Sequence, residues 1–129
     1  MVLDTSALLA LLLDEPEAEA FRLAVEEDTV RLLSAATLLE TALVIEARKG
    51  QAGGRELDLL RHKAGIEVVA VDAEQVAEAR RAYRRFGRGH HPAGLNYGDC
   101  FAYALARTSG EPLLFKGADF DKTDVRRVP

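Results

Sequence analysis

Apolar and polar positions follow two periods along the chain, and together they predict strands separated by helices. Short apolar runs at 2–4, 30–33, 66–71 and 113–115 have the length and composition of buried strands. Between these runs apolar residues recur at helical spacing, and capping residues or glycines bound each segment. The expected helices cover residues 7–13, about 16–27, 35–49, 55–63, 73–86 and 100–108, and residues 125–128 have the pattern of a short edge strand.

This order of elements predicts the fold class. A parallel connection between strands needs a crossover of about a dozen residues, usually a helix. Strands that alternate with helices therefore indicate an α/β fold, a three-layer sandwich with a parallel sheet covered on both faces. A length of 129 residues without repeats or linkers fits a single domain.

Composition narrows the class of protein further. Hydrophobic residues make up 48% and charged residues 29%, which excludes a disordered or fibrous chain. The longest apolar run, residues 7–13, is far shorter than the roughly 20 residues that span a bilayer. Met1 is followed directly by strand-like residues, so no signal peptide is expected, and the lone Cys100 favours a reducing cytoplasm. A net charge of −4 argues against nonspecific coating of DNA.

Three aspartates stand where a strand, helix or turn begins or ends. Asp4 ends the first strand, Asp99 precedes a helix, and Asp119 lies in a Gly-Ala-Asp-Phe turn. Each has an ordinary structural interpretation, because Asp is a common helix N-cap and often forms Asx-turns.

Glu40 is harder to explain structurally. Its neighbours one helical turn away are Ala36, Thr37, Leu43 and Val44, and none of them is charged. Glu40 is therefore expected on the core-facing side of its helix, where an unpaired carboxylate is costly. A buried ion pair is the structural alternative.

The predicted topology brings these four acids together. The carboxyl ends of parallel strands and the starts of the following helices share one edge of the sheet, which is where ligands bind in such folds. Two carboxylates about 4 Å apart repel by about 4 kcal/mol at an effective dielectric near 20. Such a cluster needs protons or cations, and a set of oxygen ligands without His or Cys favours Mg²⁺ or Mn²⁺.

Four segments also resemble a known family. The segments VLDTSALL around Asp4, LLETAL around Glu40, LNYGDCFAYALA around Asp99 and LLFKGADF around Asp119 are similar to those of PIN-domain proteins. The resemblance is greatest to the VapC toxins of VapBC toxin–antitoxin pairs. It extends over essentially the whole chain, with the motifs in the family's order.

The resemblance implies a single PIN domain over residues 1–129, with a Rossmann-like sheet in strand order 3-2-1-4-5. It also implies an acidic quartet of Asp4, Glu40, Asp99 and Asp119, with Thr5 or Ser6 as the small hydroxyl residue that follows the first Asp. Asp121 and Asp124 lie close enough to compete for the fourth position, and Asp119 is preferred because it directly precedes Phe120. A homodimer and a small antitoxin protein are the implied partners.

A local excess of positive charge suits an RNA substrate. Residues 79–98 contain no acid, and the segment leads directly into Asp99. A solvated helix face is the structural alternative for such a run, but its place beside the quartet favours contacts with phosphates. The candidate RNA-binding residues are Arg80, Arg81, Arg84, Arg85 and Arg88.

The leading hypothesis is therefore an Mg²⁺- or Mn²⁺-dependent endoribonuclease that acts as a toxin. Asp4 and Asp99 would hold the principal ion, and Asp119 and Glu40 would complete its ligand shell directly or through water. One alternative is a PIN-like module that binds RNA or protein without catalysis. Another is aspartyl-phosphate chemistry of the phosphatase or receiver type, which fits poorly because Ser6 stands where those phosphatases carry a second Asp.

Overall fold

The sheet is parallel throughout and has four short strands. The structure, a computed structural model, describes all 129 residues. The strands lie in the order β3-β2-β1-β4, and β1 and β2 pair with Val2 opposite Leu32. Their bounds are β1 Val2–Leu3, β2 Leu32–Ser34, β3 Glu67–Val69 and β4 Leu113–Leu114.

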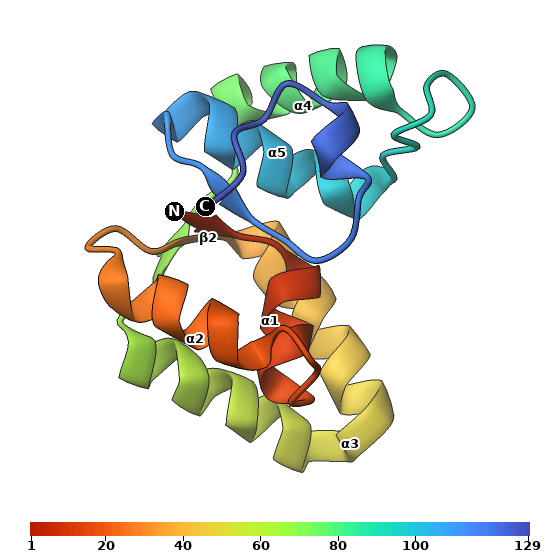
Figure 1. Cartoon of the computed structure of the whole chain (residues 1–129). Helices are drawn as coiled ribbons and strands as arrows, with labels where there is room; N and C mark the ends of the chain where they lie inside the picture. Colours follow the sequence, from red (N-terminus) through yellow and green to blue (C-terminus); the bar gives the residue numbers. More distant parts are fainter.

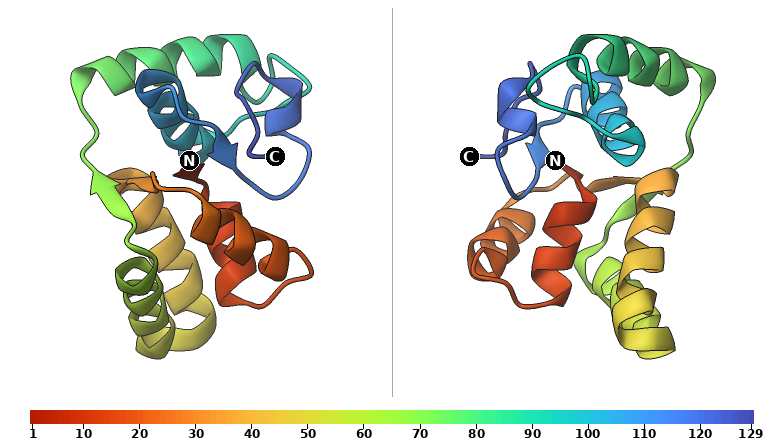
Figure 2. Two further views of the ribbon diagram at one scale, coloured as in Figure 1. Left: turned by 60° about the vertical axis from the view of Figure 1, so that its left-hand side comes forward. Right: turned by 90° about the vertical axis from the view of Figure 1, so that its right-hand side faces the viewer.

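Helices cover both faces of this sheet (Figure 1). One layer holds α1 Thr5–Leu12, α2 Ala18–Glu27 and α3 Ala35–Ala64. The other layer holds α4 Ala73–Phe86 and α5 Tyr97–Ser109, and a short 3₁₀ helix, η1, spans Phe120–Lys122. Figure 2 shows the two layers from other sides, with the sheet between them. The predicted three-layer α/β sandwich is thus confirmed.

Two cores form because neighbouring strand residues point to opposite faces. Val2 and Leu113 pack with Phe86 and Tyr103 on the face covered by α4 and α5. Leu3 belongs to the other core, together with the apolar residues of α1 and α2. The strands β1 and β4 are buried on both faces, so they appear in the sequence as short continuous apolar runs.

The strand order differs from the predicted order 3-2-1-4-5 at one edge of the sheet. The first four strands follow it, but residues 125–128 form no fifth strand. Leu113 makes only an isolated parallel bridge with Arg127, through backbone hydrogen bonds to Arg126 (2.8 Å) and Val128 (3.0 Å). Arg126 and Arg127 are exposed, so this segment has little apolar surface with which to extend the sheet.

The helix expected at 35–49 ends at Gly50 as predicted, because Gly50 has non-helical backbone angles (φ of 62°) and divides α3 into two arms. The second arm begins before residue 55, so Gly53 and Gly54 are helical instead of breaking the chain. A Cβ on Gly53 would lie 2.8 Å from the carbonyl oxygen of Ile45, so the absence of a side chain lets the arms approach. None of the helices combines the length and the apolar character that crossing a bilayer requires.

Candidate functional site

Asp4 is fixed at the centre of the sheet's carboxyl edge. It follows β1 and caps α1, so its N-cap interpretation is correct, and its side chain is buried. Oδ2 of Asp4 accepts hydrogen bonds from the Ser6 backbone N–H (3.1 Å) and from Ser6 Oγ (2.7 Å). Burial raises the pKa of Asp4, and the charge of Glu40 raises it further. Asp4 is therefore held by neutral donors in a setting that disfavours its charge.

Two hydroxyl groups connect the start of α1 to other elements. Ser6 Oγ also accepts a hydrogen bond (2.9 Å) from the backbone N–H of Lys116, in the loop that leads to Asp119. Thr5 donates from Oγ1 to Glu40 Oε1 at 2.5 Å. Both hydroxyl residues that follow Asp4 thus contact an acid of the quartet, Ser6 on Asp4 and Thr5 on Glu40.

Glu40 lies against the start of α5. It is partly buried in the second turn of α3, and a Cβ on Gly98 would overlap its carboxylate. No Lys, Arg or His side chain pairs with Glu40, and the same is true of Asp4, Asp99 and Asp119. The buried ion pair that could have explained Glu40 is absent.

Asp99 is not the N-cap of its helix, as its position had suggested. Asn96 caps α5, and Asp99 is the third residue within the helix. The two form a capping box: Asp99 Oδ2 accepts from the Asn96 N–H (3.0 Å), and Asn96 Oδ1 accepts from the Asp99 N–H (2.9 Å). Either residue suits a cap, so the sequence alone favoured the wrong one.

Asp99 is the acid on which the charges of the other three acids act. Burial raises the pKa of Asp99 from 3.8 to about 6, and the charges of Asp4, Glu40 and Asp119 raise it as well. The adjacent Cys100 thiol has a pKa raised to about 11, by burial and by the charge of Asp99, so it is neutral. The charges of the other three acids thus act on Asp99, and the convergence of the four on one cation stays a prediction.

Asp119 stands apart from the two acids that follow it. It is exposed at the start of η1, and its side chain makes no capping hydrogen bond, so the expected Asx-turn is absent. Asp121 pairs with Arg127 at 2.7 Å, and Asp124 pairs with Arg85 at 3.2 Å and accepts from Tyr103. Among the largest influences on the pKa of Asp99 is the charge of Asp119, which favours it as the fourth acid.

The donor chemistry of this site fits a hard cation. The quartet offers carboxylate oxygens without His or thiolate, the ligands that Mg²⁺ and Mn²⁺ prefer. Its excess of negative charge has no protein cation to offset it. The side chains do not form a ready-made ligand cage, since no three His, Cys, Asp or Glu groups lie close enough together to hold an ion.

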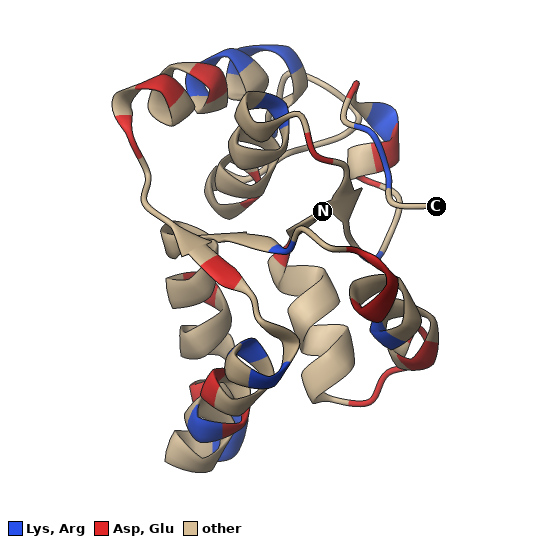
Figure 3. Cartoon of the chain, turned by 90° about the vertical axis from the view of Figure 1, so that its left-hand side faces the viewer, with Lys and Arg blue, Asp and Glu red and all other residues tan.

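The arginine run divides into paired and unpaired members. Arg81 pairs with Glu78, and Arg85 pairs with Asp124 at 3.2 Å. Arg80, Arg84 and Arg88 have no carboxylate partner. Figure 3 shows acids on the first half of α4 and basic residues on its second half.

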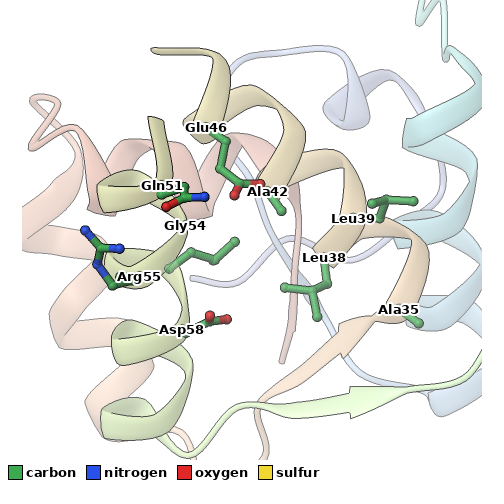
Figure 4. Close-up of a pocket in the computed structure, with 10 residues that line it drawn as sticks. Ala35, Leu38, Leu39, Ala42, Glu46, Gln51, Gly54, Arg55 and Asp58 are labelled. Atoms are coloured by element: carbon green, nitrogen blue, oxygen red, sulfur yellow. The ribbon is translucent and has the colours of Figure 1, made fainter. Parts of the chain in front are cut away.

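Arg80 and Arg84 line a groove of about 620 Å³ between α4 and α5. Tyr83 and Tyr97 also line it, and Tyr97, which is 80% exposed, lies two residues before Asp99. Arg80 and Arg84 therefore belong to the surface beside the start of α5, which carries Asp99. A second groove of about 560 Å³ separates the two arms of α3 and contains none of the four acids (Figure 4).

Comparison with known proteins defines the class. The PIN-domain family profile matches residues 1–126, so the chain belongs to the PIN-domain family. Within that family it is of the VapC type. It is 63% identical over 128 residues to ribonuclease VapC30 of Mycobacterium tuberculosis, covering 99% of this chain and 98% of that protein. It is 62% identical to ribonuclease VapC of Mycolicibacterium smegmatis, covering 99% of each.

Solved structures share the fold at low sequence identity. The crystal structure of Mycobacterium tuberculosis VapC20, described as a sarcin-ricin loop cleaving toxin, matches with a TM-score of 0.79 and 20% identity, covering 98% of this chain and 97% of that one. VapBC2 of Rickettsia felis, bound to a promoter DNA fragment, matches with a TM-score of 0.77 and 12% identity, covering 99% and 96%.

The raised pKa of Asp99 predicts that the metal-free protein loses stability as pH rises from about 4 to about 6. The folded state binds the proton more tightly than the unfolded state in this window, so the free energy of unfolding falls with pH. Melting by circular dichroism in EDTA should give a higher Tm at about pH 5 than at about pH 7.5. The pKa values of Asp28 and Asp124 are lowered, so they titrate below this window.

Asp99→Asn is the matched control, because an amide oxygen still accepts the Asn96 N–H while the charge is gone. It should melt higher than the wild type at about pH 7.5 and depend less on pH. A lower Tm for this variant would mean that the acid serves only the capping box.

Proposed function

We propose that this chain is an Mg²⁺- or Mn²⁺-dependent endoribonuclease, the toxin component of a toxin–antitoxin pair. The observation that carries the proposal is the set of four carboxylates at one sheet edge without any basic partner. The names of its relatives support the same substrate, since VapC30 is called a ribonuclease and VapC20 a toxin that cleaves the sarcin-ricin loop. The reaction is hydrolysis of an RNA phosphodiester bond by water.

Each acid has a proposed role that follows from its surroundings. Asp4 and Asp99 would hold the principal ion, and Asp119 and Glu40 would complete its shell directly or through water. When bound, the ion lowers the pKa of a ligated water and offsets the charge that develops on the phosphate. Glu40, held by Thr5, orients the attacking water. Ser6 keeps Asp4 in place against the loop that carries Asp119.

The partners follow from the same surfaces. RNA phosphates contact the unpaired arginines Arg80, Arg84 and Arg88, and the products carry 5′-phosphate and 3′-hydroxyl ends. The structures that share this fold include VapBC complexes, which supports a small cognate antitoxin as the protein partner. We further propose that the toxin is a homodimer and acts in the cytoplasm.

The other two hypotheses fit the site less well. A module that only binds RNA or protein would have no need for four unpaired acids, which cost stability. Aspartyl-phosphate chemistry of the phosphatase type needs a second acid where Ser6 stands, and Ser6 Oγ instead donates to Asp4.

Removing one charge from the quartet should abolish cleavage while the fold remains. Asp4→Asn and Asp99→Asn keep the size and an accepting oxygen of each side chain, so the rate should fall by roughly a hundredfold or more from the loss of the ligand charge alone. Cleavage of a fluorescent RNA is measured in EDTA and then with added Mn²⁺. The control is Asp121→Asn, which removes a nearby acid already paired with Arg127 and should leave the rate unchanged. Wild-type cleavage that persists in EDTA would contradict the metal-dependent mechanism.

The division of the arginines predicts which of them bind RNA. Arg80→Ala with Arg84→Ala should weaken RNA binding, and each lost phosphate contact should reduce the slope of log K against log salt by about 0.7 to 0.9. Arg81→Ala with Arg85→Ala should change the slope little, because those side chains are held by Glu78 and Asp124. Binding is measured by fluorescence anisotropy in an Asp99→Asn background, which prevents cleavage. Equal slopes for the two double variants would assign the whole run to a solvated helix face.

A further inference from the structure

The backbone conformation at position 98 does not require a glycine. Gly98 is the second residue of α5 and lies in ordinary helical conformation, whereas six other glycines have φ between 59° and 96°. A glycine inside a helix is less favourable than an alanine, because it has more backbone freedom to lose on folding. The reason for a glycine at this position must therefore lie in what occupies the space beside it.

The space is filled by the carboxylate of Glu40. The three atoms nearest to a Cβ built on Gly98 are Oε2, Cδ and Oε1 of Glu40, and Oε2 would overlap it. The opposite oxygen, Oε1, accepts the 2.5 Å hydrogen bond from Thr5. Glu40 is thus held between the start of α1 and the start of α5, one residue from Asp99.

We propose that Gly98 is a positioning residue, whose missing side chain lets Thr5 hold the Glu40 carboxylate over the start of α5 beside Asp99. The importance of that position for RNA hydrolysis rests on the function proposed above. A side chain at Gly98 displaces the end of a long, flexible residue, so the fold survives. Such a side chain breaks the hydrogen bond from Thr5 to Glu40 and moves the Glu40 carboxylate out of its position in the site.

The chain contains a matched control for this effect. A Cβ on Gly54 would lie 2.8 Å from Oε1 of Glu46, so a carboxylate also crowds a helical glycine there. Glu46 is exposed and makes no hydrogen bond, and both residues line the groove between the arms of α3 (Figure 4). Glu46 can swing into solvent, so Gly54→Ala should leave RNA cleavage unchanged.

The first test is a double-mutant cycle on cleavage in Mn²⁺. Gly98→Ala should lower kcat by roughly ten- to a hundredfold, the range expected for a misplaced group, and leave KM within about threefold. In a Glu40→Gln background the same change should cost less than about twofold, because the group that it displaces no longer functions. Wild-type cleavage by Gly98→Ala, or losses that multiply in the double variant, would overturn the proposal. A wild-type protein that cleaves no RNA would refute the proposed function instead.

The second test needs no activity. In a Glu40→Ala background the three atoms nearest to a Gly98 Cβ are gone, so Gly98→Ala should raise the Tm by about 2 to 6 °C. In the wild-type background the displaced carboxylate and the lost Thr5 hydrogen bond should cancel this gain. An equal change in Tm in both backgrounds would show that Glu40 does not occupy the place of a Gly98 side chain, and the positioning role would fail even if the protein is a ribonuclease.

Discussion

Repulsion of the Asp99 carboxylate by the charges of Asp4, Glu40 and Asp119 is the constraint on which the candidate site depends. Asp4 follows β1 and Asp119 follows β4, while α5 contributes Asp99 and α3 contributes Glu40. One candidate for a counter-charge is Lys116, whose backbone N–H donates to Ser6 Oγ. Its ammonium group instead pairs with Glu15 at 2.9 Å and Glu17 at 3.5 Å, beyond α1. The ammonium group of Lys116 is thus directed away from this edge, and the raised pKa of Asp99 indicates a local loss of stability of the kind found at functional sites.

The way in which the acids are held follows from that constraint. Their hydrogen-bond donors are hydroxyl groups and backbone N–H groups: Ser6 serves Asp4, Thr5 serves Glu40, and the Asn96 N–H serves Asp99. A lysine or arginine in any of these places would fix the acid equally well, but it would offset the charge. Neutral donors fix geometry and leave the negative charge available to a cation. This explains why the two residues after Asp4 are both hydroxylic.

Structural features that depend on residues close together in the sequence were predictable, whereas features that depend on a contact between separate elements were not. The strand runs, the cap at Asp4 and the isolation of Glu40 depend on spacings of a few residues, and the structure confirms them. The cap of α5 was misplaced because Asn96 and Asp99 both suit it. Arg85 pairs with an acid 39 residues away, and Asp121 pairs with an arginine six residues away. The sequence pattern alone therefore could not show that Arg85 and Asp121 are paired while similar residues beside them are not. Gly98 went unnoticed because its reason is a side chain on another helix.

The same separation of charges explains how an acidic protein can suit a polyanion. The net charge of −4 is spread over the chain, but the second half of α4 carries arginines without acids between them (Figure 3). Arg81 and Arg85 are held by Glu78 and Asp124, which leaves Arg80 and Arg84 facing the groove beside Tyr97. An RNA strand along that groove would meet positive charge first and the quartet next. Under the proposed function, the quartet alone would repel the phosphate backbone, so attraction to the quartet would depend on a cation, whereas the arginines would attract RNA without one.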